Sequence, residues 1–135
     1  MTALAALLRK LPALKELLLG NCGIRDEGVA SLVDNLGKDD FKALKRLYLD
    51  MNELTDKACD TLVAVLNEGG MPKLTRLRVH AENDFSDAAA DALAQAAARR
   101  GVRVARRVAS IAISIASIVF LNYTAVYGVT LSRHI

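Results

Sequence analysis

The stretches LKELLLGNCGI at Leu14–Ile24 and LKRLYLDMNEL at Leu44–Leu54 share one arrangement of leucines and end in the same kind of turn. A third copy, LTRLRVHAENDF, occupies Leu74–Phe85 and contains one additional residue. The copies start 30 residues apart, and agreement of three copies in register indicates a true internal repeat.

Each copy predicts a strand followed by a helix. The alternating leucines are typical of a short strand with one buried face. Thr55 and Ser86, each followed by Asp, are well placed to begin helices in the second and third copies. In the second copy the apolar residues at i, i+4, i+7 and i+8 are Ala58, Leu62, Val65 and Leu66. Stacked units of this kind bury their apolar faces together, which predicts an α/β fold with a curved parallel sheet inside and helices outside.

The repeated unit, LxxLxLxx(N/C)x(I/L), resembles the leucine-rich-repeat family, in particular the ribonuclease-inhibitor-like class found in NOD-like receptors and Ran GTPase-activating proteins. The resemblance covers roughly Leu4 to Val104. It implies a leucine-rich-repeat solenoid over residues 1–104, with about three full units and partial ends. In this family an Asn is typical at the position of Asn52, in the turn after the strand, where its side chain forms hydrogen bonds with backbone groups. Cys22 and Glu82 occupy or adjoin that position in the other copies, and the insertion suggests an irregular third turn.

Composition limits the kind of core and the kind of partner. Hydrophobic residues make up 53% of the 135 residues, but aromatic residues make up only 4% and Trp is absent, so aliphatic side chains must form the core. The net charge of +3 does not by itself indicate nucleic acid, and we expect no nucleic-acid partner. The two cysteines, Cys22 and Cys59, form neither a disulfide framework nor a metal-binding pair, and we expect reduced, buried thiols.

The sequence contains no pattern that indicates catalysis. Neither His80 nor His134 has Cys, Asp or Glu residues nearby at metal-ligand spacing. Gly-rich phosphate loops and the common hydrolase and metalloprotease motifs are absent. We therefore expect no enzymatic activity, no cofactor and no metal ion.

Alternation along the strands predicts a binding face. If Leu17, Leu47 and Leu77 point into the core, their neighbours point to the concave face of the sheet. Stacking would align these neighbours in columns, with an exposed tyrosine among three arginines, a composition common at protein interfaces. The predicted protein-binding residues are Glu16, Leu18, Arg46, Tyr48, Asp50, Arg76, Arg78 and His80. A solvated polar strand face is the alternative interpretation.

These features predict a non-catalytic interaction module that binds a protein partner through the concave face of its repeats. The partner's identity does not follow from these residues. Two alternatives stay open. One is a regulator of a small GTPase resembling Ran GTPase-activating proteins, and the other is a fragment of an NOD-like-receptor sensor.

Residues 105–135 differ from the repeats. A basic linker leads into residues 108–131, which contain no charged side chain. This candidate transmembrane helix would hold the repeats on the cytoplasmic side of a membrane, because five arginines precede it and one follows it. Two alternatives stay open: an apolar segment packed on the last repeat, where the alternating Ile111, Ile113 and Ile115 would form a strand, and an aberrant C-terminus. The polar residues that argue against insertion are Ser110, Ser114, Ser117, Asn122, Thr124 and Thr130.

We predict that the C-terminal segment anchors the chain in a membrane. A helix of 24 residues would rise about 36 Å, against a hydrocarbon core of about 30 Å. Extraction of membranes with alkaline carbonate should leave the full chain in the pellet and release a version that ends at Arg107. Equal release of both proteins would show that the segment does not span a bilayer.

Overall fold

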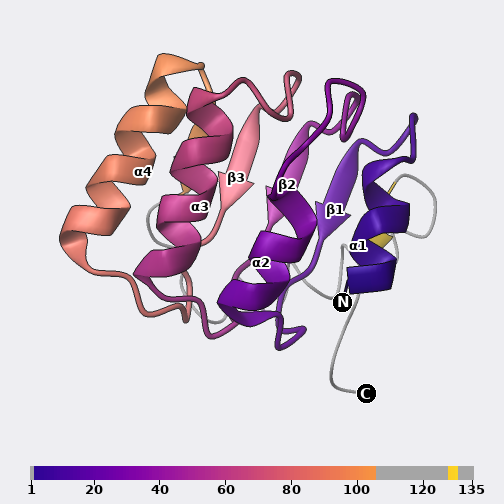
Figure 1. Cartoon of the computed structure of the whole chain (residues 1–135). Coiled ribbons are helices and arrows are strands. Elements are labelled where there is room, and N and C mark those ends of the chain that lie inside the picture. Colours follow the sequence, from indigo (N-terminus) through magenta and orange to yellow (C-terminus); the bar gives the residue numbers. More distant parts are fainter. Residues whose placement is uncertain (1, 106–127, 131–135) are drawn as a thin grey trace.

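The computed structural model describes residues 2–105 and 128–130, and in these residues helices alternate with short strands (Figure 1). The helices are α1 (Thr2–Arg9), α2 (Arg25–Val33), α3 (Asp56–Asn67) and α4 (Asp87–Arg99). The strands are β1 (Glu16–Leu18), β2 (Arg46–Tyr48), β3 (Arg76–Arg78), β4 (Arg103–Ala105) and β5 (Gly128–Thr130).

The described strands form one sheet in the order β4-β3-β2-β1-β5, and every pair is parallel. Leu17 lies opposite Leu47, and Leu47 lies opposite Leu77, so the 30-residue interval of the sequence becomes the register of the sheet. The helices follow one another in the same order as the strands and cover one face of the sheet (Figure 1). The predicted α/β class and the predicted parallel pairing are confirmed.

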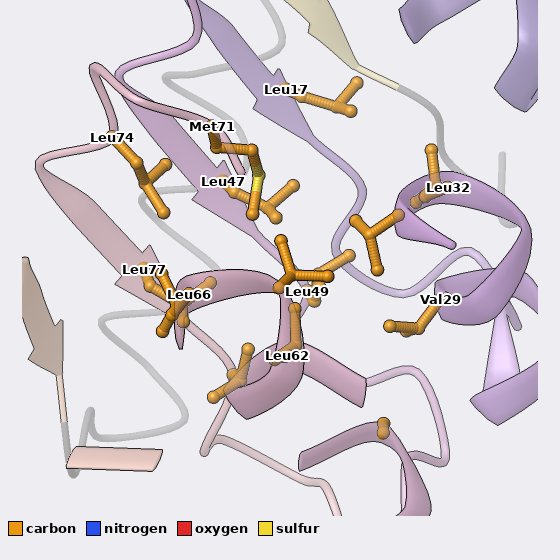
Figure 2. Packing of buried hydrophobic residues seen from close by; sticks show 14 of the residues in the cluster. Leu17, Val29, Leu32, Leu47, Leu49, Leu62, Leu66, Met71, Leu74 and Leu77 are labelled. Atoms are coloured by element: carbon orange, nitrogen blue, oxygen red, sulfur yellow. The ribbon is translucent and has the colours of Figure 1, made fainter. Parts of the chain in front are cut away.

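The core fills the layer between this face and the helices. Leu17, Leu47 and Leu77 of the strands share one buried cluster with Leu62 and Leu66 of α3, and the side chains of this cluster lie between the sheet and the helices (Figure 2). All of these side chains are almost completely buried. Because burying a leucine stabilises a fold by about 1.5–3 kcal/mol, these repeated contacts between neighbouring units account for much of the stability.

Two asparagines, the buried Asn52 and the partly buried Asn83, join the turns that follow the strands. Asn52 Oδ1 accepts hydrogen bonds from the backbone N–H groups of Cys22 and Ile24, at 2.8 and 3.3 Å. Its Nδ2 donates to the carbonyl oxygens of Leu19 and Leu49, at 2.7 and 3.0 Å. One carboxamide therefore satisfies backbone groups of two consecutive units, which would otherwise be buried without partners.

Asn83 makes the same set of bonds one unit later. Its Oδ1 accepts from the N–H groups of Asn52 and Leu54, and its Nδ2 donates to the carbonyls of Leu49 and Val79. The third turn thus keeps the hydrogen-bond pattern of the second despite its additional residue. The insertion led us to expect an irregular third turn, but it moves the asparagine by one position and leaves the hydrogen bonds of its side chain equivalent to those of Asn52.

The helix N-termini are also joined from unit to unit. Asp26 accepts hydrogen bonds from the N–H and the hydroxyl of Thr55, at 2.9 and 2.6 Å. Asp56 holds Ser86 in the same way, at 2.8 and 2.7 Å. Thr55 and Ser86 cap α3 and α4 as predicted from the sequence. The starts of α3 and α4 are therefore each tied to the helix before them.

The predicted transmembrane span, residues 108–131, lies outside the described residues except for Gly128–Thr130. Those three residues form β5, which pairs with β1 and not with the strand of the last repeat. Within residues 2–105 and 128–130, no helix combines the length and the apolar composition needed to cross a bilayer.

A buried carboxylate ties the first helix to the loop before β2. Asp40 is 3% exposed and accepts hydrogen bonds from Arg9 Nη2 at 3.1 Å and Lys10 Nζ at 2.6 Å. The N–H of Gly37 donates to the same carboxylate at 2.8 Å. The bond from Lys10, followed by those from Gly37 and Arg9, lowers the pKa of Asp40 to about 2.

This carboxylate should make the stability of the fold depend on pH. Because its pKa is lower in the folded chain than in the unfolded chain, its stabilising effect is complete above about pH 4 and is lost as the pH falls toward 2. Asp40→Asn should lower the free energy of unfolding by about 1–3 kcal/mol at pH 6, as measured by urea titration. The difference between the two proteins should shrink steadily between pH 4 and pH 2. A difference that does not change with pH would contradict this role.

Candidate functional site

The second face of the sheet carries the residues selected from the sequence. Leu17, Leu47 and Leu77 belong to the core, so the residues on either side of them point to the opposite face. Strand register places Glu16 beside Arg46 and Arg46 beside Arg76. A second column consists of Leu18, Tyr48 and Arg78. Two of the three predicted columns are therefore present in the register of the sheet.

In the first column an ion pair neutralises two of the charges. Arg46 Nη1 donates to Glu16 Oε1 at 2.6 Å. The Glu16 side chain is 10% exposed and that of Arg46 is 41% exposed, so the carboxylate is largely withdrawn from water while the guanidinium stays accessible. Arg76, the next residue in the column, is exposed.

In the second column the charged groups pack on an aromatic ring. The Arg78 guanidinium carbon lies 4.8 Å from the centroid of the Tyr48 ring, a cation–π contact. Arg78 Nε also forms an ion pair with Asp50 Oδ2 at 3.2 Å. Burial raises the pKa of Asp50, while the charge of Arg78 and a hydrogen bond from the N–H of Ala81 act in the opposite direction.

The expectation of an exposed tyrosine was wrong. Tyr48 is 5% exposed and Leu18 is 4% exposed, although neither residue belongs to the core cluster beneath the helices. Tyr48 lies under the guanidinium of Arg78, and Leu18 lies beside Tyr48 in the register of β1 and β2. Alternation predicted the correct face for these two residues but not how closely their neighbours would enclose them.

The third predicted column, formed by Gly20, Asp50 and His80, lies beyond the last residues of β1, β2 and β3. Asp50 turns toward Arg78 and the backbone of Ala81. The His80 ring packs edge-on against Phe85, with 5.9 Å between the ring centroids. The contacts of His80 therefore belong to the third turn, and the structure does not bring it together with the arginine column.

The sequence analysis missed Arg103. This residue lies in β4 opposite Arg76, and it is exposed. Val104 beside it packs against the core, which places Arg103 on the same face as Arg46 and Arg76. The sequence could have indicated this position, because Val102 and Val104 flank Arg103 with the same alternation as the leucines of the earlier strands.

The possible metal ligands and the two thiols of the described residues can be located in the structure. Among residues 2–105 and 128–130, no three His, Cys, Asp or Glu side chains are grouped so that they could hold a metal ion. Burial raises the pKa of Cys22 to about 11 and, aided by nearby carboxylates, that of Cys59 to about 12. Both groups are therefore thiols, not nucleophilic thiolates, at neutral pH.

The sequence matches no protein-family model and no curated protein sequence. Any function assigned to this face consequently rests on its geometry and its charge.

Proposed function

We propose that the chain is a segment of a leucine-rich-repeat solenoid that acts as a non-catalytic protein-interaction module and binds a protein partner through the sheet face opposite the helices. For the solenoid, the support is the repetition of contacts: Asn52 and Asn83 make equivalent bonds, as do Asp26 and Asp56. Each contact joins one unit to the next, as expected for units that stack in one direction.

The observation that carries the binding function is a sheet face that none of the described helices covers and that carries accessible cations. Parallel sheets are usually covered on both faces. All of the described helices lie on one face of this sheet (Figure 1). On the other face Arg46 is partly exposed, and Arg76 and Arg103 are exposed. Side chains held on paired strands offer a partner a preorganised surface, which reduces the entropy lost on binding.

Membrane attachment through residues 108–131 is a separate proposal that rests on the sequence alone. If the segment inserts, it would hold this module near the cytoplasmic surface of the bilayer. The GTPase-regulator and receptor-fragment alternatives stay hypotheses, since none of the contacts described above is specific to either activity.

Site-specific photocrosslinking tests the binding face. We would replace Arg46 or Arg76, one at a time, with p-benzoylphenylalanine in the full chain and irradiate cells of the source organism. Each position should give a discrete crosslinked product of the same partner. Asp60, an exposed residue on α3, is the control position and should not give this product. A partner that crosslinks only from Asp60 would place the interface on the helices and contradict the proposal.

A further inference from the structure

On the sheet face opposite the described helices, one row consists of arginines on three consecutive strands. Strand pairing places Arg46 beside Arg76, and Arg76 beside Arg103. Neighbouring strands lie about 4.8 Å apart, so the three side chains leave the sheet as a closely spaced row. The sheet therefore concentrates positive charge along one line across its strands.

Only some of the arginines on this face form ion pairs with carboxylates. Arg46 is paired with Glu16, and Arg78 is paired with Asp50. In residues 2–105 and 128–130, no carboxylate forms an ion pair with Arg76 or Arg103. Two adjacent exposed guanidinium groups thus remain without an acidic partner in the part of the chain that the structure describes.

Placing Arg76 directly beside Arg103 does not stabilise the folded chain. Like charges directly opposite each other on neighbouring strands are destabilising. Binding of anions would remove the repulsion between Arg76 and Arg103. A guanidinium group also presents a planar set of donors that matches a carboxylate with two parallel hydrogen bonds.

We propose that Arg76 and Arg103 bind carboxylates of an acidic, extended protein segment that crosses the strands of the sheet. The inference rests on the proposed function and specifies the chemistry of the partner. In an extended segment, side chains at i and i+2 point the same way and lie about 7 Å apart, a distance that two flexible arginines on adjacent strands can match.

The surroundings favour carboxylates over a nucleic acid. Tyr48, the aromatic residue of these columns, is 5% exposed and so offers no surface on which a base could stack. Two uncompensated cations would also give only weak binding to a polymer that depends on many phosphate contacts.

A labelled peptide tests this inference on the full chain. The probe is a fluorescein-labelled decapeptide of alternating Glu and Ser, and its control alternates Gln and Ser. Fluorescence anisotropy should show binding of the Glu peptide and much weaker binding of the Gln peptide. The double variant Arg76→Gln/Arg103→Gln should raise the Kd of the Glu peptide about tenfold, as expected for the loss of two surface ion pairs.

A matched variant controls for net charge. Lys57→Gln/Arg99→Gln removes the same two charges from the exposed surfaces of α3 and α4 and should change the Kd less than about twofold. Thermal melts of both variants would verify that they are folded.

Three results would overturn the inference: no binding of the Glu peptide by the parent chain, equal weakening in both double variants, or tighter binding of oligo(dT) than of the Glu peptide. If the Glu peptide does not bind but positions 46 and 76 still crosslink to a partner, the proposed binding face is supported and only the acidic character of the partner is wrong. Loss of the crosslinks would instead remove the proposed function itself.

Discussion

The carboxamide of Asn52 lies where two consecutive turns meet, and the residue is completely buried. Its Oδ1 accepts hydrogen bonds from two backbone N–H groups of the first turn. Its Nδ2 donates to the carbonyls of Leu19 and Leu49, the residues that directly follow β1 and β2. No other neutral side chain of this size offers two donors and an acceptor with two lone pairs. Strands of three residues provide few ladder hydrogen bonds, so their relative position depends strongly on these side-chain contacts.

The arginine row follows from this register. A shift of one residue between β2 and β3 would turn Arg76 toward the core and Leu77 toward the second face, which is prohibited by the burial of Leu77. The same bonds that order the turns therefore also place Arg46, Arg76 and Arg103 beside one another. In this way the core on one face determines the pattern of charges on the other.

The sequence predicted the features that repeat and missed those that depend on unique contacts. The spacing of the leucines predicted the strands. The hydroxyl residues that precede Asp predicted the helix N-caps at Thr55 and Ser86. Asn83 escaped notice because an insertion moved it out of alignment. The burial of Tyr48 depends on the position of Arg78, a contact between strands that alternation alone does not specify. The strand Gly128–Thr130 pairs with a segment more than a hundred positions earlier, and local pattern carries no information about such pairing.

Amide hydrogen exchange in Asn52→Ala is the most direct test of the claim that this carboxamide holds neighbouring units in register. The amide of Cys22 should lose protection in Asn52→Ala, and urea titration should show a loss of about 2–5 kcal/mol, because several buried backbone groups are left unsatisfied. Asn67→Ala, at the exposed end of α3, should change neither quantity appreciably. Unchanged protection at Cys22 together with parental stability in Asn52→Ala would contradict the account.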